Sequence, residues 1–467
     1  MSTWRSYKLW AVPLVAGVLA FGALPAVTGS AGAATPGSVR DDFDGDGYQD
    51  LAVGAPNATV SGKQEAGHVV VMYGGKHGLD KTRRTVISRA TTGIPGAAAT
   101  GEGFGVQLSK GDLDGDGRTD LIVGHTSSVR DAVVVWGGRR GLSGGVSVPA
   151  AITRAGDFDG DGKQDLALFR TGRSQVDDPY GTTATVWTGP LSRSGRPAAA
   201  KAFGSDDFRY YDVLDAAAGD VNGDGRDDLA LTYYIGDGGY GSAFYLASAS
   251  GSASGGVFTS AAAPEGTGEA AFGDVNDDGY DDLVRGDEDR STITVALGSA
   301  AGLSPEATWK TYSQNTPGVP GGKESVDLFG ASVSAGDING DGYDDVAVGA
   351  PGEELGYDDG AGVVDVLYGG PGGLTGKGAQ GFSQDTAGVP GAVESGDDFG
   401  AAVRLLDING NGYADLAVSA AHENSGDGAV WSLRGRPAGI VTDAAFAFGG
   451  KTVGAPYAKA AFGYAVN

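Results

Sequence analysis

An acidic nonapeptide decides the fold, and its first copy reads Asp42-Phe43-Asp44-Gly45-Asp46-Gly47-Tyr48-Gln49-Asp50. Six further copies follow, with 45 to 70 residues between successive starts. Self-similarity of this kind is the signature of a repeat architecture. The seven copies, called loops one to seven here, occupy residues 42-50, 112-120, 157-165, 220-228, 274-282, 337-345 and 407-415.

Each loop spaces its oxygen atoms as a hard divalent cation requires. Side-chain oxygens at positions one, three, five and nine, with the backbone carbonyl of position seven, can converge on one Ca²⁺ if glycine permits the turn. The loop opens like an EF-hand, but position twelve of the first copy is Val53, so position nine takes the role of the bidentate Glu. The predicted ligands are Asp42, Asp44, Asp46, Tyr48 and Asp50; Asp112, Asp114, Asp116, Arg118 and Asp120; Asp157, Asp159, Asp161, Lys163 and Asp165; Asp220, Asn222, Asp224, Arg226 and Asp228; Asp274, Asn276, Asp278, Tyr280 and Asp282; Asp337, Asn339, Asp341, Tyr343 and Asp345; and Asp407, Asn409, Asn411, Tyr413 and Asp415.

The seven predicted calcium sites differ in their number of carboxylates, and we rank their expected calcium affinity by that number. Loops one to three offer four carboxylates each, loops four to six have Asn at position three, and loop seven keeps only Asp407 and Asp415. We expect the first three loops to bind calcium most tightly and the seventh most weakly. Single Asp/Gly-rich loops are often only solvated turns. Seven copies in register favour metal sites, with calcium serving mainly the structure.

Short apolar runs show what the loops connect. Residues 51-53 and 346-348 follow loops one and six as apolar runs too short for helices, so they are predicted to be buried strands. A weaker fourth strand per repeat fits the spacing. Four strands per repeat, in units that cannot bury both faces alone, predict an all-β, seven-bladed β-propeller. A third strand is predicted over residues 69-73, 132-136, 183-187, 292-297 and 363-368.

Two further motifs accompany the loops. Phe104-Gly105, Phe329-Gly330 and Phe399-Gly400 stand eight residues before loops two, six and seven, and each is expected to open a first strand. With endings such as Val53-Gly54-Ala55-Pro56, they resemble the FG-GAP repeat of integrin α N-terminal propellers. The resemblance is strong in repeats one, two, six and seven and weaker in three to five. Because integrin α propellers carry such loops in only some blades, this chain is more similar to secreted bacterial FG-GAP proteins.

The two ends of the chain complement each other. The first repeat has no Phe-Gly strand of its own, whereas the chain finishes with Phe462-Gly463-Tyr464-Ala465-Val466-Asn467, an opening strand without a loop after it. If Phe462 takes the place eight residues before Asp42, the C-terminus stands beside Arg40. The last six residues would then complete blade one and leave no open edge in the ring.

The N-terminal residues predict export. Residues 1-33 are predicted to be a signal peptide, because Arg5 and Lys8 precede an apolar run over 9-27 that ends in small residues. An uncleaved membrane anchor is the alternative, since the run is near spanning length. The propeller would then span 34-467, with no membrane span after cleavage, and be secreted and extracellular, free or associated with the cell surface.

The composition of the chain limits the classes of molecule that it can bind. The chain has 59 acidic and 33 basic residues, a formal net charge of −26, which disfavours nucleic acid. It has no cysteine, which excludes disulfides and zinc-thiolate sites. With 85 Gly and 18 Pro, it favours many short strands and tight turns over long helices. We expect a monomer with calcium as its natural counter-ion.

No catalytic signature stands out. There are four histidines, and the one match to a nucleophile elbow, Gly141 to Gly145 around Ser143, has no helix pattern after it and is interpreted as a turn. Acidic residues are too abundant to select a catalytic pair. The leading hypothesis is therefore a non-catalytic module of the binding or adhesion type. An extracellular hydrolase or lyase on the same scaffold is an alternative.

Two local features bear on the ligand, an extracellular protein or glycan. Arg285-Gly286-Asp287 resembles an integrin-ligand tripeptide, but in repeat five it occupies the place of Val-Gly-Ala. Blade four is rich in aromatics that could stack sugar rings, which makes a lectin-like propeller a further alternative, although buried strand residues would give the same pattern. These aromatics are Phe208, Tyr210, Tyr211, Tyr233, Tyr234 and Tyr240.

Overall fold

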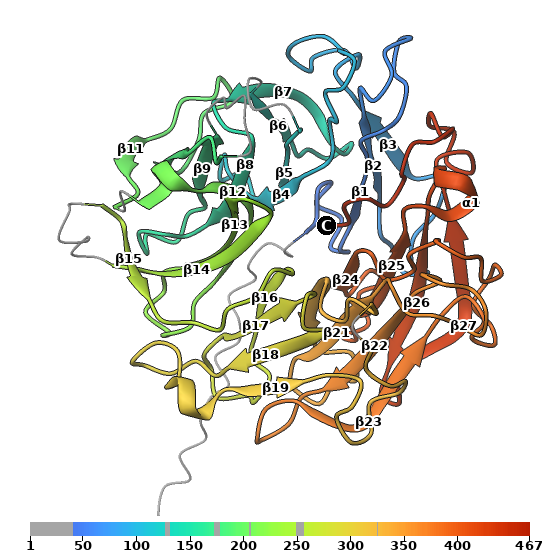
Figure 1. Cartoon of the computed structure of the whole chain (residues 1–467). Helices are drawn as coiled ribbons and strands as arrows, with labels where there is room; N and C mark the ends of the chain where they lie inside the picture. The colour runs from blue at the N-terminus through green and yellow to red at the C-terminus, as the bar shows by residue number, and fades with distance from the viewer. Residues whose placement is uncertain (1–40, 127–130, 172–177, 205–206, 249–255, 325) are drawn as a thin grey trace, which may run out of the picture. The chain divides into compact units, whose positions relative to one another are not determined.

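Seven antiparallel sheets surround a central axis in the computed structural model of the chain (Figure 1). It describes residues 41–126, 131–171, 178–204, 207–248, 256–324 and 326–467. In each sheet the strands pair in chain order, every strand with the next. The prediction of an all-β, seven-bladed propeller is confirmed. The predicted signal peptide lies outside the described residues.

The strands follow one another blade by blade. Blades one to four contain β1 (Leu51–Ala55), β2 (His68–Met72), β3 (Arg84–Ile87); β4 (Leu108–Gly111), β5 (Asp120–Val123), β6 (Ala132–Trp136), β7 (Ser143–Val148); β8 (Ile152–Gly156), β9 (Asp165–Thr171), β10 (Thr182–Thr188), β11 (Ala199–Ala202); and β12 (Asp212–Gly219), β13 (Asp228–Gly236), β14 (Gly239–Ala247), β15 (Phe258–Ala261). Blades five to seven contain β16 (Ala270–Gly273), β17 (Asp282–Asp287), β18 (Thr292–Ala296), β19 (Lys310–Tyr312); β20 (Ser332–Gly336), β21 (Asp345–Ala350), β22 (Val363–Tyr368), β23 (Thr375–Phe382); and β24 (Val403–Leu406), β25 (Asp415–Ala420), β26 (Ala429–Arg436), β27 (Gly439–Phe448). The helical turns are η1 (Asp207–Tyr210), η2 (Glu306–Thr308) and α1 (Glu423–Gly426).

The hydrophobic core lies between neighbouring blades. Val69 and Val71 of blade one, for example, share a cluster with Leu121 and Val123 of blade two. Equivalent clusters join every neighbouring pair, including blade seven with blade one. Both faces of each sheet are therefore covered. This explains why the strands that follow the acidic loops, such as β1, are apolar throughout instead of alternating between apolar and polar residues.

The Phe-Gly and Gly-Ala motifs are packing devices at these interfaces. Phe104 is fully buried, and Gly105 has a φ of +99°, which suits glycine. A Cβ on Gly54 of blade one would lie 2.0 Å from the carbonyl oxygen of Gly105, so only glycine fits there. Phe104-Gly105 therefore forms a turn that docks on the preceding blade, and the first strand, β4, begins only at Leu108. The expectation that Phe-Gly itself opens the strand is wrong by three to four residues, because the positive φ is incompatible with extended backbone.

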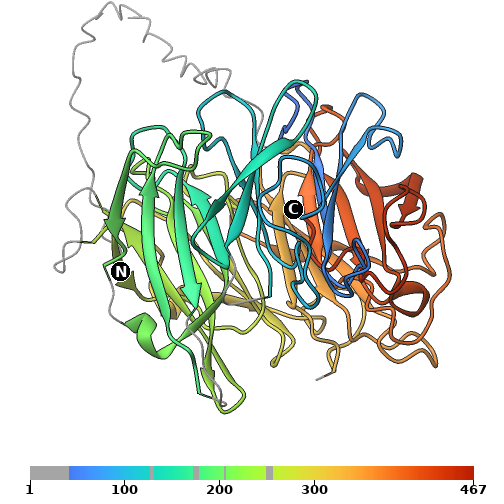
Figure 2. The same ribbon diagram turned by 90° about the horizontal axis from the view of Figure 1, so that it is seen from above.

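The C-terminal segment completes blade one, as predicted. Ala52 and Asn467 exchange two backbone hydrogen bonds, of 2.7 and 2.9 Å, and Gly54 exchanges two more with Ala465 and Gly463, of 2.8 and 2.9 Å. Val466 forms an antiparallel bridge with Val53. In Figure 1 the C-terminus lies beside β1, and in Figure 2 it again lies against blue segments of the chain. Arg40, its predicted neighbour, lies outside the described residues.

Charged side chains, unforeseen from the sequence, converge on the axis. Gln107 Nε2 of blade two donates to the carbonyl oxygen of Leu214 in blade four at 2.6 Å, so side chains reach across the ring. Burial and repulsion from Arg404 lower the pKa of Lys110 to about 7, although Asp41 lies 2.9 Å from its Nζ. Burial and Asp215 raise the pKa of Glu269. The interacting set comes from the first strands of four blades and, in blade five, from the residue directly before β16: Lys110, Arg154, Asp215, Arg404 and Glu269.

Candidate metal centres

All seven loops lie at the same end of the ring, because each leads into the second strand of its blade. The position-one aspartate organises the loop: both oxygens of Asp42 accept backbone hydrogen bonds, from Gly45 at 2.6 Å and from Gly47 at 2.8 Å. The bond from position six recurs in every loop at 2.7 to 3.1 Å. Position six is always glycine, with φ between +79° and +92°. The repeated glycine therefore holds a left-handed turn.

The position-nine aspartate is buried at the base of each loop. In loop one, Asp50 accepts from Phe43 N at 2.8 Å and from Gly74 N at 2.8 Å, which ties the loop to the end of β2. Two backbone bonds do not offset the burial, which raises the pKa of Asp50 to about 8. Burial likewise raises the pKa of its counterparts, to about 7 in Asp120, Asp165, Asp282 and Asp345, about 8 in Asp228 and about 6 in Asp415.

Three carboxylates converge in each of the first three loops. Oxygens of Asp42, Asp44 and Asp50 lie within 4.8 Å of one another, as do those of their counterparts in loops two and three. The donor set contains only oxygen atoms, which suits calcium or magnesium rather than a softer metal. A divalent cation among these groups would also keep the buried ninth carboxylate ionised, despite its raised pKa. The residues present therefore fit the ion that the sequence predicts.

The later loops differ at position three. In loops four to six an asparagine replaces aspartate, and its Oδ1 accepts a bond from the backbone of position five, as in Asn339 to Asp341 N at 2.9 Å. In loop seven, Asn409 instead donates from Nδ2 to Asp415 Oδ2 at 2.7 Å. An amide N–H therefore faces the buried carboxylate where the other loops place an oxygen. This geometry supports the prediction that the seventh site is the weakest.

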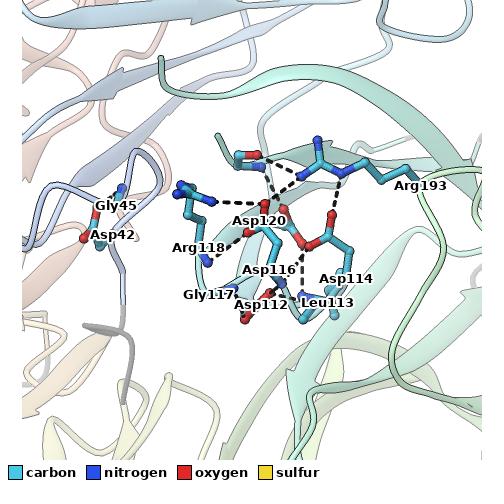
Figure 3. A network of polar contacts seen from close by, with 12 residues as sticks. Asp42, Gly45, Asp112, Leu113, Asp114, Asp116, Gly117, Arg118, Asp120 and Arg193 are labelled. Atoms are coloured by element: carbon cyan, nitrogen blue, oxygen red, sulfur yellow. Dashed lines mark hydrogen bonds and ion pairs between the residues drawn. The ribbon is translucent and has the colours of Figure 1, made fainter. Parts of the chain in front are cut away.

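Basic side chains cover the three loops that have four carboxylates. Arg193 pairs with Asp114 and, at 3.0 Å, with Asp116 (Figure 3). Arg83 lies 3.2 Å from Asp44 and 2.6 Å from Asp46. In loop three, Lys201 lies 2.8 Å from Asp159. Each of these cations therefore contacts the third-position aspartate, a member of the converging trio. The fifth-position aspartates lie outside the trios: Asp46 and Asp116 pair with the same arginines, and Asp161 pairs with Lys163 at 2.7 Å. The loops with the most carboxylates thus also carry competing positive charges.

Position eight links successive loops around the ring, a role that the metal pattern did not reveal. The Asp281 carboxylate accepts from Asp220 N at 2.9 Å, and Asp281 N donates to the Asp220 carbonyl oxygen at 3.1 Å. The same pair of bonds joins Asp344 to Asp274. The one sequence signal for this link is an aspartate at position eight, which is not a predicted metal ligand, directly before the predicted ligand at position nine. Each such loop is therefore held by the next blade as well as by its own.

Two other motifs receive structural roles. Arg285 is 1% exposed and its Nη1 donates to Thr232 Oγ1 at 2.9 Å, while a Cβ on Gly286 would lie 1.9 Å from the carbonyl oxygen of Gly330. The Arg-Gly-Asp tripeptide is thus part of the core strand β17, with Arg285 and Gly286 packed inside the propeller, so it is not an exposed receptor-binding loop. Ser143 is the first residue of β7, directly after a turn at Gly141. The interpretation of residues 141–145 as a turn is therefore right only for the start of the motif, because Ser143, Gly144 and Gly145 belong to a strand.

Comparison with known proteins agrees with this geometry. A family model described as FG-GAP repeat matches residues 37–72, 104–136, 329–367 and 399–433. Integrin alpha-PS2 of Drosophila melanogaster is 34% identical over 200 residues, 39% of this chain and 13% of that protein. Integrin alpha-4 of Xenopus laevis is 35% identical over 121 residues, 26% of this chain and 11% of that protein. The chain thus matches only a small part of each relative's length.

Among solved structures, the one described as BBS1N in complex with ARL6DN, soaked with mercury, gives a TM-score of 0.39 at 11% identity. That match covers 70% of this chain and 78% of the other.

The fold and the loops together define a seven-bladed β-propeller with an acidic loop in every blade. The chain carries FG-GAP repeats in four places, and its propeller resembles that of integrin α subunits. The four matched ranges are the repeats with the strongest predicted resemblance, so that prediction is confirmed. Within the described part of the chain, no helix has the length and apolar character needed to cross a membrane.

Proposed function

We propose that this chain is a secreted, calcium-stabilised and non-catalytic module that binds an extracellular protein or glycan. The observation that carries the calcium assignment is the convergence of three carboxylates within 4.8 Å in loops one, two and three. Secretion rests on the predicted signal peptide. The binding role rests on the four FG-GAP repeats and on the similarity to integrin α subunits.

The two ends of the ring differ in a way that supports this division of labour. One end carries the seven acidic loops, whose side chains are engaged in holding the loops together. The opposite end carries long connections between blades, such as residues 88–107 and 383–402. Variable loops on a rigid scaffold are where binding sites commonly lie. Calcium therefore stabilises one face, and ligand binding belongs to the other.

Unfolding curves with calcium and with excess chelator test the structural role of the metal. If each site has a dissociation constant of roughly 0.1 mM, millimolar calcium adds about 1.4 kcal/mol of unfolding free energy per site. Asp165→Asn should reduce the calcium-dependent increment more than Asp415→Asn, its matched change in the weakest loop. An unfolding midpoint that is the same with calcium and with chelator would contradict the proposal.

A further inference from the structure

Two adjoining cavities open at the end of the ring opposite the acidic loops. Their volumes are about 680 and 300 Å³. The larger lies along blade five and the connection to blade six, and the smaller lies between the β13–β14 and β17–β18 hairpins. We call them together the tyrosine groove. Glu265, Asp287, Asp289 and Arg290 line both cavities, so the two form one continuous depression.

Aromatic rings form the blade-four wall of the tyrosine groove. Tyr233 stacks on Tyr211 with ring centres 4.2 Å apart and planes 15° from parallel. Its other face packs on Gly241, where a Cβ would lie 2.7 Å from the ring. Tyr240, also in the lining, is 52% exposed and packs on Tyr234, its cross-strand partner, with ring centres 5.4 Å apart. Tyr240 is thus supported on one side and exposed elsewhere, an arrangement that can stack on a flat, partly apolar ligand.

The remaining lining is made of hydrogen-bonding groups. Thr292, Thr294 and Thr311 lie along the larger cavity. Glu265 and Asp289 are exposed, whereas Asp287 is buried and pairs with Arg290 at 2.7 Å. Exposed carboxylates accept hydrogen bonds from ligand hydroxyls. Four acids, Glu265, Asp287, Asp289 and Glu324, outnumber the two bases, Arg290 and Lys323.

This chemistry selects among possible ligands. An excess of negative charge repels phosphate, sulfated and carboxylated ligands. Tyrosine faces beside carboxylates and hydroxyls match the apolar face and the hydroxyls of a pyranose ring. The combined volume is in the range of an oligosaccharide of a few residues. We propose that the tyrosine groove is a carbohydrate site for uncharged oligosaccharides, which rests on the proposed binding function and names its ligand class and location.

A glycan array of neutral and acidic oligosaccharides, probed with the calcium-loaded protein, tests the proposal, followed by titration calorimetry with the best neutral binder. Tyr240→Ala should weaken binding about tenfold, since an aromatic contact contributes about 1 kcal/mol or more and 1.4 kcal/mol is a factor of ten. Glu265→Gln should weaken it severalfold. Matched controls are Tyr357→Ala, at a 99% exposed tyrosine one blade further on, and Glu306→Gln, at an exposed acid of η2.

The outcomes separate the site from the broader function. Binding of neutral glycans that both groove variants weaken and both controls retain supports the proposal. Unchanged affinity in Tyr240→Ala and Glu265→Gln, with each variant folded by circular dichroism, overturns the location. A preference for acidic glycans overturns the ligand class. An empty array beside capture of a purified extracellular protein overturns the glycan assignment but leaves the binding function standing, whereas turnover of a glycan overturns the non-catalytic function itself.

Discussion

Closure of the ring by its C-terminal segment makes a sharp quantitative prediction. Phe462 is fully buried, contacts Phe448 edge-on with ring centres 5.9 Å apart, and belongs to the cluster between blades seven and one. Truncating a buried phenylalanine to alanine costs about 3–5 kcal/mol. Deleting residues 462–467 also removes the four backbone hydrogen bonds that the segment makes with β1, at about 1 kcal/mol each. The deletion should therefore cost about 7–9 kcal/mol, comparable to the entire stability of a typical domain.

The assay is urea unfolding in saturating calcium, followed by tryptophan fluorescence. Trp136 and Trp431 report on blades two and seven, the two neighbours of blade one, so the signal covers both sides of the closure. We expect Phe462→Ala to lower the unfolding free energy by about 3–5 kcal/mol. The deletion should leave little folded protein, and both blades should lose structure together because the edges of blades one and seven become exposed.

Matched variants make the result interpretable. Phe399 has the same motif position in blade seven and is equally buried, so Phe399→Ala should cost the same within about 1 kcal/mol. Tyr464, in the same terminal segment, is 52% exposed, and Tyr464→Ala should change stability by less than about 0.5 kcal/mol. If Phe462→Ala were nearly neutral while Phe399→Ala was costly, the terminal segment would not close the ring in solution.

Three further predictions concern single positions. Gly54→Ala should lower the unfolding free energy by about 1–3 kcal/mol in urea unfolding, because its Cβ would meet the Gly105 carbonyl oxygen. Gly322 has open space around it, so Gly322→Ala should leave the unfolding free energy unchanged. Equal effects of the two changes would refute the packing role of Gly54. Arg193→Ala should strengthen calcium binding at loop two by about two- to fivefold in a titration followed by Trp136 fluorescence, because an exposed ion pair contributes about 0.2–1 kcal/mol; weaker binding would mean that Arg193 supports the site. Burial lowers the pKa of His68 to about 4, and neither ring nitrogen has a hydrogen-bond partner within the part of the chain described. The unfolded state therefore binds more protons between pH 4 and 6.5, so stability should fall by about 3 kcal/mol on acidification through this window. His68→Leu should remove that portion of the pH dependence, and an unchanged difference between the two proteins from pH 7 to pH 4 would show that His68 does not titrate as proposed.

Local chemistry explains why the propeller and its acidic loops could be predicted from the sequence. The aspartate spacing, the loop glycines and the short apolar runs after each loop act over fewer than fifteen residues, and the strands predicted at 132-136 and 363-368 match β6 and β22. Even the closure of the ring was predictable. The first repeat lacks a Phe-Gly segment before Asp42, and the C-terminus has one at Phe462 without a loop after it. Turns, strands and ligand spacings that depend on residues close together in the chain can be recognised from the sequence pattern alone.

The tertiary structure alone decided what depends on residues far apart in the chain. It placed Arg193 over Asp114, brought Lys110 and Arg404 together at the axis, and set Tyr240 beside Asp289 in one groove. It also buried Arg285-Gly286-Asp287, a motif that looks exposed when read alone. The physical reason is that burial, desolvation and charge pairing between blades are properties of the closed ring. The acidic loops follow from the sequence, but their competing cations and the groove at the opposite end exist only once the seven blades meet.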